Sequence, residues 1–286
     1  MHFLILSVIC SVLVSVLLKL APRRGIDIAQ AVTWNYLAAS VLSLLLRPSL
    51  QSLRDGHAPW PALLGLALAL PCIFLVLARA VREAGIVRSD VAQRLSLLLS
   101  LGAAFVLFGE HANGWKLAGL GLGLLAIVGV SARSGERGAG TASSWRWLLA
   151  VWAGFALIDI LLKQVALAGT PATAALLASF AIAFVLMLGW QLLRHYRGRQ
   201  RLQARNLGFG LLLGAINFGN ILFYVRAHQA LPHSPATIFA GMNIGVVCLG
   251  ALVGVLAFGE KTSAWNRVGL GLAVVAIALI ARGAQG

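Results

Sequence analysis

Apolar runs of about 17–25 residues recur along the whole sequence, and they restrict the possible folds more than any other feature. Each run is long enough to cross the roughly 30 Å hydrocarbon core of a bilayer as an α-helix. The chain is 60% hydrophobic and 11% charged, which leaves too few polar side chains to cover a water-soluble globule. Alternating strand patterns are absent, whereas spanning helices satisfy their own backbone polar groups. The sequence therefore predicts an all-α integral membrane protein.

The apolar runs, bounded by Pro, Gly and charged residues, predict ten transmembrane helices. The predicted spans are 2–21, 30–47, 61–78, 91–108, 114–132, 147–168, 171–193, 206–226, 235–257 and 264–282. The hydrophilic stretch SARSGERGAGTASSW at 131–145 separates the fifth span from the sixth. We therefore divide the chain into a five-helix unit at 1–135, a connecting loop at 136–146 and a second five-helix unit at 147–286.

The two units share sequence. VLFGEHANGWKLAGLGL (106–122) recurs as LAFGEKTSAWNRVGLGL (256–272), with eight of 17 positions identical. A weaker match aligns SVLLKLA (15–21) with DILLKQV (159–165), and the offsets between matched segments grow in order from 144 to 150. Ordered offsets indicate a duplicated unit with small loop insertions. In this alignment Lys19 stands opposite Lys163, and Gln93 opposite Asn243.

The copied unit has an odd number of spans, so the second copy must cross the membrane in the opposite sense. Sixteen of the 23 Lys and Arg residues flank the odd-numbered connections and five flank the opposite face, so both units place their positive excess on one side. That side is expected to be cytoplasmic, with both termini outside. The prediction is two inverted five-helix repeats, an arrangement that in transporters places a binding site near the bilayer midplane.

Three features carry a resemblance to a known family: FGE followed by a Gly-rich helix at the end of each unit, the run RAHQALPHSPATIFAGMNIGVV (226–247), and VRSDVAQRLSLLLSLGAAFVLFGE (87–110). Through these the whole chain resembles the drug/metabolite transporter superfamily, specifically the EamA-type ten-helix permeases. The resemblance implies two inverted five-helix repeats, a central cavity lined by helices 1, 3, 4, 6, 8 and 9, and export or exchange of small metabolites. Family substrates include amino acids, nucleotide sugars and drugs, so the resemblance leaves the substrate open.

Charged residues inside the predicted spans are candidates for function, because a charge near mid-bilayer costs roughly 2.5–3.5 kcal/mol on insertion scales. Asp159 and Lys163 lie four residues apart on one helix face, where they can hold a zwitterion, exchange a proton for substrate, or only neutralise each other. Gln93 and Arg94 open the fourth predicted span, and the Arg94 guanidinium suits a carboxylate or phosphate unless it lies in the interface. Lys19 is near its helix end and can reach the interface.

Amide side chains in the later spans form a second group of candidates. Asn217, Asn220 and Tyr224 share one stripe of their helix, and amides in hydrocarbon lack partners, so this stripe should face protein or a cavity. Hydrogen bonding between packed helices is the alternative for this stripe. Asn243 can serve either role.

The predicted substrate-binding residues are Gln93, Arg94, Asp159, Lys163, Asn217, Asn220, Tyr224 and Asn243, with Lys19, Asn35 and Tyr36 as possible additions. For Asn35 and Tyr36 a structural role is favoured, because the resemblance places the second helix at the periphery. Glu110 and Glu260 are interpreted as polar residues of tight turns.

These features predict a secondary transporter, an exporter or exchanger of a small polar metabolite such as an amino acid, that works by alternating access around the central cavity. A flippase for a lipid or lipid-linked sugar is the alternative. We expect a multi-pass protein of a bacterial-type cytoplasmic (inner) membrane, present as a monomer or weak homodimer. An enzyme is not indicated, since the eight Asp and Glu residues are scattered singly. No metal, cofactor or nucleic-acid partner is expected, because the cysteines lack ligand spacing and the basic residues lie in short loops beside spans.

Overall fold

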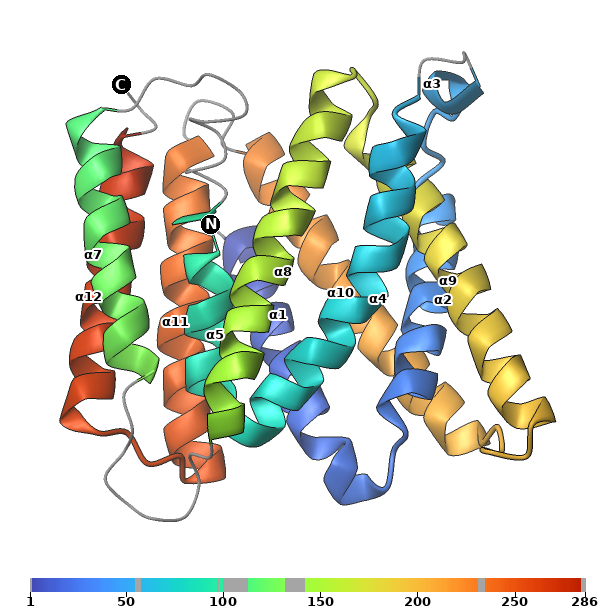
Figure 1. The fold of residues 1–286 in the computed structure, drawn as a ribbon. Coiled ribbons are helices and arrows are strands. Elements are labelled where there is room, and N and C mark those ends of the chain that lie inside the picture. Colours follow the sequence, from blue (N-terminus) through green and yellow to red (C-terminus); the bar gives the residue numbers. More distant parts are fainter. Residues whose placement is uncertain are drawn as a thin grey trace.

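The computed structural model describes residues 2–54, 58–96, 98–99, 113–131, 142–230 and 235–283, and these residues form helices joined by short turns (Figure 1). The long helices are α1 (His2–Leu20), α2 (Ile28–Leu45), α4 (Trp60–Ala84), α5 (Ile86–Leu95), α7 (Gly114–Ser131), α8 (Ala142–Leu167), α9 (Ala172–Tyr196), α10 (Ala204–Ala230), α11 (Pro235–Phe258) and α12 (Ala264–Gly283). Two short elements, the 3-10 turn η1 (Pro22–Arg24) and α3 (Gln51–Arg54), lie in connections. The predicted all-α fold is confirmed for the described residues.

Eight of the described helices are long and apolar enough to cross a membrane, namely α1, α2, α4 and α8 to α12, and α7 contributes a shorter apolar helix over Gly114–Ala126. Large apolar side chains on the outside of the bundle, such as those of Leu45, Leu68, Val185 and Leu256, are exposed. Lipid tails are as apolar as leucine, so such a surface suits a bilayer. The chain is therefore a multi-pass membrane protein. Each predicted span overlaps one long helix, although the part of 91–108 that follows residue 99 lies outside the described residues.

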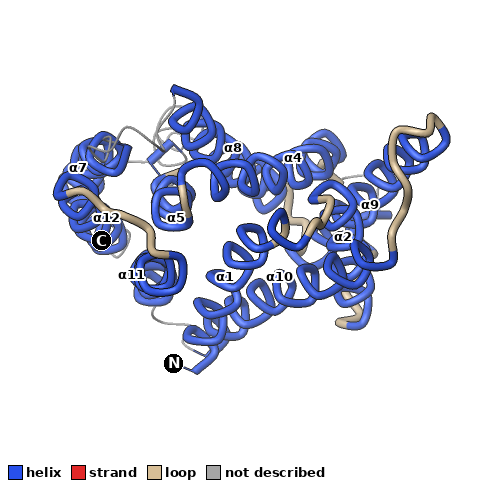
Figure 2. The backbone as a smooth tube through the Cα atoms, turned by 90° about the horizontal axis from the view of Figure 1, so that it is seen from below, coloured by secondary structure: helices blue, strands red, loops and turns tan. Residues whose placement is uncertain are grey.

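The helices fall into two groups when viewed along the bundle (Figure 2). A larger apolar core is built mainly from α1, α2, α4, α8, α9 and α10, and a smaller one from α5, α7, α11 and α12. A third cluster joins α1 and α10 to α11. We call the first set the large group and the second set the small group. The two groups meet along α1 and α8, which pack against α11 and α5 respectively.

Successive long helices alternate in direction along the bundle (Figure 1). The connections at 21–27, 85, 197–203 and 259–263 therefore lie at one end, which we call the basic face because most loop arginines gather there. The connections at 46–59 and 168–171 lie at the opposite face, as do the ends of the described chain at His2 and Gly283.

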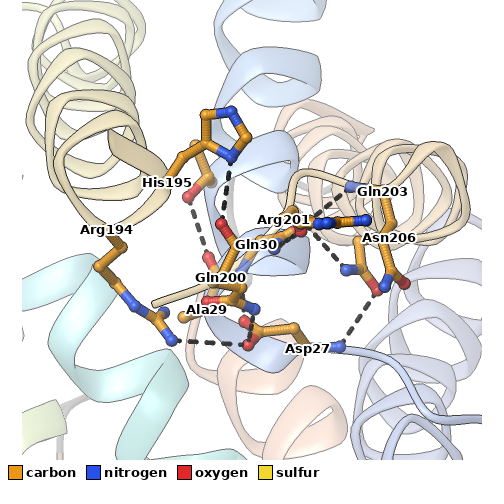
Figure 3. Close-up of polar contacts among 10 residues, drawn as sticks. Asp27, Ala29, Gln30, Arg194, His195, Gln200, Arg201, Gln203 and Asn206 are labelled. Carbon is orange, nitrogen blue, oxygen red and sulfur yellow. Dashed lines mark hydrogen bonds and ion pairs between the residues drawn. The ribbon is translucent and has the colours of Figure 1, made fainter. Parts of the chain in front are cut away.

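A polar network at the basic face fixes the ends of three helices of the large group (Figure 3). Asp27 caps α2 by accepting from the Gln30 backbone N–H at 2.9 Å, and its own N–H donates to Asn206 Oδ1 at 3.1 Å. Asn206 Nδ2 donates in turn to Gln30 Oε1 at 2.8 Å. Arg194 at the end of α9 reaches Asp27 Oδ2 at 3.9 Å. Since Gln30 and Asn206 are buried, these bonds satisfy polar groups that water cannot reach.

Helices α10 and α2 approach closely through glycine. A Cβ atom built on Gly214 would lie 2.6 Å from the carbonyl oxygen of Asn35, and one built on Gly210 would lie 2.5 Å from that of Ala31. Backbone atoms of a packed helix cannot move aside as the end of a flexible side chain can. The α2–α10 contact therefore depends on these two glycines.

Replacing Gly214 with alanine is expected to destabilise the protein by about 1–3 kcal/mol, the usual cost of overpacking. Gly208 on the same helix has nothing within 4 Å of its Cβ position. Gly208→Ala should therefore leave stability unchanged or raise it by up to about 1 kcal/mol through helix propensity. The unfolding midpoints of the two purified variants in detergent measure the difference, and equal midpoints would contradict the close α2–α10 contact.

Candidate functional site

A cavity of about 240 Å³ lies where the two helix groups meet. Its lining comes from four helices, α5, α8, α10 and α11, and from Ser96, which directly follows α5. The lining residues are Gln93, Arg94, Ser96, Phe155, Asp159, Asn220, Ile221, Tyr224, Met242 and Asn243. Seven of these ten side chains carry polar atoms, so the cavity is a polar chamber within an apolar bundle.

The cavity lies about halfway through the bundle. Arg94 Nη2 donates to the Ser11 hydroxyl at 2.7 Å, and Ser11 is the middle residue of the 19-residue helix α1. A guanidinium at this depth is far from the headgroups at either face, because α1 rises about 1.5 Å per residue on both sides of Ser11. The depth matches that of binding sites in transporters built from repeated units.

The turn that carries Arg94 is held by bonds from neighbouring helices. Trp152 of α8 donates from Nε1 to the carbonyl oxygen of Leu95 at 2.8 Å, a carbonyl near the end of α5. Such carbonyls lack partners within their own helix, so Trp152 satisfies one and fixes the neighbouring Arg94. Arg94 Nη1 lies 3.5 Å from Asn243 Oδ1, and within the described structure its buried Nε has no hydrogen-bond partner. The guanidinium therefore keeps a donor for a further acceptor.

Two opposite charges line the same cavity, Arg94 from α5 and Asp159 from α8. Neutral polar groups lie around them. Asn220 accepts a 2.8 Å bond at Oδ1 from the Ser7 hydroxyl of α1, which fixes the orientation of its amide. A ligand with one negative and one positive group can therefore be bound at both ends, by the fork of Arg94 and by the carboxylate of Asp159.

Six of the eight residues predicted to bind substrate meet in this cavity. The six are Gln93, Arg94, Asp159, Asn220, Tyr224 and Asn243. Lys163 lies one turn beyond Asp159 on α8, outside this set. Asn217 points to a different neighbour, since its Nδ2 donates to Asn35 Oδ1 at 3.4 Å. The predicted stripe on α10 is divided because this helix packs against both α1 and α2.

The three additional candidates lie away from the cavity. Asn35 and Tyr36 are buried in the large group, where the Tyr36 ring packs edge-on against Phe74 with centroids 6.1 Å apart. Lys19 forms an ion pair with Glu260 at the basic face and lies 4.9 Å from the Phe258 ring centroid.

The sequence-based start of the fourth span is wrong. Gln93 and Arg94 do not open this helix, because α5 begins at Ile86, about two turns earlier. Gly85 alone separates α4 from α5, with a φ of 92° that glycine tolerates. Charged residues in the first turns lower the local hydropathy, and a search for apolar runs therefore starts the span too late.

Two carboxylates at the helix contacts were missed by the sequence analysis. Asp90 is 2% exposed and accepts from the Ser15 hydroxyl at 2.8 Å. Glu260 pairs with Lys19 and also accepts from the backbone N–H groups of Ile86 at 2.7 Å and Val87 at 3.1 Å. It thus caps the N-terminus of α5 from the turn after α11.

A sequence signal for these partners exists on the first helix. Ser7, Ser11, Ser15 and Lys19 repeat every four residues, so they lie on one face of α1. A polar stripe of this length on an otherwise apolar helix indicates polar partners on the neighbouring helices.

Comparison with known proteins agrees with this architecture. Residues 1–132 match the model of the EamA-like transporter family. A protein of Haemophilus influenzae, described only as uncharacterized, is 40% identical over 284 residues, which cover 97% of this chain and 96% of the relative. A solved crystal structure of a protein is similar over 99% of both chains, with a TM-score of 0.60 and 17% identity, and this similarity shows the fold alone. The chain therefore belongs to the EamA-like transporter family, within the drug/metabolite transporter superfamily.

Proposed function

We propose that this protein is a secondary transporter, an exporter or exchanger, of a small polar metabolite that carries both a carboxylate and an ammonium group, such as an amino acid. The observation that carries the proposal is the presence of the cation Arg94 and the anion Asp159 in the lining of one cavity at mid-depth of the bundle. Charges at this depth are expensive unless they serve a pathway or pair with a ligand.

The size of the cavity favours a small substrate. Its volume of about 240 Å³ is below the roughly 300–1,000 Å³ that is common for sites of drug-sized ligands. At about 30 Å³ per water molecule it corresponds to about eight waters. A compact metabolite fits this space better than a drug or a nucleotide sugar.

The polar groups of the cavity suit the two ends of such a substrate. Arg94 offers a planar fork to the carboxylate, and its Nε, which has no hydrogen-bond partner among the described residues, supports a role in binding an acceptor. Asp159 offers its carboxylate to the ammonium group. The amides of Gln93, Asn220 and Asn243 supply hydrogen bonds to both ends.

Helix packing supports the proposed inverted repeats. In the proposed repeats, α1, α2, α4, α5 and α7 correspond in order to α8, α9, α10, α11 and α12. Helix α1 packs against α10 and α11. Its counterpart α8 packs against α4 and α5, which are the counterparts of α10 and α11. Each of α2, α5 and α7 packs against its own counterpart, α9, α11 and α12 respectively. Counterparts run in opposite directions in Figure 1, as α1 and α8 show. Two related units of this kind offer two packings of similar energy, which is the basis of alternating access.

The charge distribution supports an orientation in a bacterial-type inner membrane. Arginine-rich connections are retained on the cytoplasmic side, so the basic face is proposed to be cytoplasmic and both termini to lie outside. The protein is proposed to work as a monomer or weak homodimer.

Replacing Asp159 with asparagine is expected to lower amino-acid transport at least tenfold. A hydrogen bond to a charged group contributes about 1.5–3 kcal/mol, and 1.4 kcal/mol corresponds to a factor of ten. Uptake by proteoliposomes of each of the twenty protein amino acids, combined with thermal shifts of the purified protein, identifies the substrate and measures the loss.

The matched control for this experiment is Glu83→Gln, which makes the same chemical change outside the cavity, where Glu83 pairs with Arg79 at 2.9 Å. The control should transport as the wild type does. Unchanged flux in Asp159→Asn would remove its proposed role, and a protein that binds no amino acid but moves labelled lipid would favour a flippase instead.

Cysteine labelling tests the orientation. Ser49 and Arg199 are exposed in connections at opposite ends of the bundle. In a background without Cys10, Cys72 and Cys248, a membrane-impermeant thiol reagent added to intact cells should label Ser49→Cys, and it should label Arg199→Cys only after the cells are permeabilised. Labelling of both variants in intact cells would contradict the proposed threading.

A further inference from the structure

Four polar residues on one face of α1 connect the cavity to the basic face. Each meets a different partner from another element, by hydrogen bond or ion pair. The pairs are Ser7 with Asn220, Ser11 with Arg94, Ser15 with Asp90, and Lys19 with Glu260. We call this set the α1 polar row. The pairs of Ser11, Ser15 and Lys19 cross the contact between the large and small helix groups, whereas the Ser7–Asn220 pair lies within the large group. The row includes two acidic residues, Asp90 and Glu260, that are not among the residues lining the cavity.

Asp90 is the most buried charged residue of this row. One of its carboxylate oxygens, Oδ1, accepts from the Ser15 hydroxyl at 2.8 Å, whereas Oδ2 has no hydrogen-bond partner in the described structure. The backbone of α11 covers Oδ2 at Gly250, where a Cβ atom would lie only 2.4 Å from it. An ionised carboxylate with an unsatisfied oxygen is costly in such a place, and a proton on that oxygen removes the charge.

Building on the function proposed above, we propose that Asp90 is a proton-binding site whose occupancy is coupled to substrate binding at Arg94. A proton from water adds to Asp90 Oδ2 and forms an O–H bond when the carboxylate of the substrate occupies Arg94. The same bond breaks and the proton returns to water when the substrate leaves. No other bond is made or broken.

The reason lies in the charge balance of one helical turn. Asp90 and Arg94 are four residues apart on α5, so they are neighbours on its surface. Without substrate, the guanidinium balances an ionised Asp90. With a substrate carboxylate on Arg94, two negative groups would share one positive group in a medium of low dielectric constant, which favours a proton on one of them. Proton and carboxylate therefore load and unload together.

Several other charged groups near Asp90 have partners of their own. Lys19 of α1 and Glu260 of the turn after α11 pair with each other. Glu83 of α4 pairs with Arg79, and Arg88 of α5 donates to Asn266 of α12 at 3.2 Å. The remaining charged groups on helices packed against α5 are Arg82 of α4, Lys116 of α7, Arg146, Asp159 and Lys163 of α8, and Arg267 and Arg282 of α12. Of these, Asp159 lines the cavity beside Arg94. Helix α11 presents Gly250 to the carboxylate. Arg94 is thus the cation near Asp90 that gains a negatively charged partner when the substrate binds.

Infrared spectroscopy of the substrate-free protein tests the proton site without knowledge of the substrate. As the pH is lowered, the wild type should gain a carbonyl stretching band of a protonated carboxyl group. The band should be lost in Asp90→Asn and kept in Glu83→Gln. If Asp90→Asn does not fold, Ser15→Ala should shift the band instead, because it removes the donor to Oδ1. A spectrum that neither Asp90→Asn nor Ser15→Ala changes would overturn the proposal.

Proton uptake on binding tests the coupling. The twenty protein amino acids are added individually to weakly buffered, detergent-solubilised protein that contains a pH-sensitive dye. An amino acid that raises the thermal midpoint should cause uptake of about one proton per bound molecule in the wild type and in Glu83→Gln, and of none in Asp90→Asn. Equal uptake in Asp90→Asn would overturn the coupling. If no amino acid binds while the infrared band depends on Asp90, the proton site is supported and the proposed substrate class fails.

Discussion

A guanidinium held halfway through a membrane bundle is the constraint on which the rest of the site depends. Arg94 cannot be left in hydrocarbon, so each helix near it must supply polar atoms. Helix α1 supplies the Ser11 hydroxyl, α11 supplies Asn243, and α8 places Asp159 in the same cavity. The polar chamber thus follows from one charge and from the groups that compensate it. In the proposed function, the carboxylate of the substrate adds the remaining compensation when it binds.

At the basic face, different kinds of contact hold the helices within the large group and join the two groups to each other. Within the large group, the Asp27 network fixes the ends of α2, α9 and α10 to one another (Figure 3). Between the groups, the Glu260 carboxylate alone connects α1, the N-terminus of α5 and the turn after α11. Gly85 and Gly254 make room for it, because a Cβ atom on either would lie within 3 Å of Glu260 Oε2. At the basic face the contact inside the large group is therefore a network of several bonds, whereas Glu260 joins three elements of the two groups through one side chain.

Most of the fold could be predicted from the sequence. Within a bilayer, a helix satisfies the hydrogen bonds of its own backbone polar groups, and the length of each apolar run identifies the helix. The sequence also identified the charged and amide residues inside the apolar runs, and most of them line one cavity. It failed where a residue is defined by its partners. Asp90 was overlooked because the charges around it delayed the predicted start of the helix, and Glu260 was interpreted as a turn residue although its carboxylate caps a different helix. Neither partner is near in sequence, so only the packing of α1, α5 and α11 reveals them.

The position of the α1 polar row links these observations. Three of its four pairs cross the contact between the large and small groups, the contact that must change if the cavity is to open alternately to the two faces. Apolar side chains at such a contact would bind equally well whether or not substrate is present. Hydrogen bonds and ion pairs respond to charge, so occupancy of Arg94 changes the energy of the contact one turn away at Asp90. In the proposed transporter, Arg94 belongs both to the binding site and to the contact between the helix groups. Binding of substrate at Arg94 would therefore change the relative stability of the two packings between which the protein alternates.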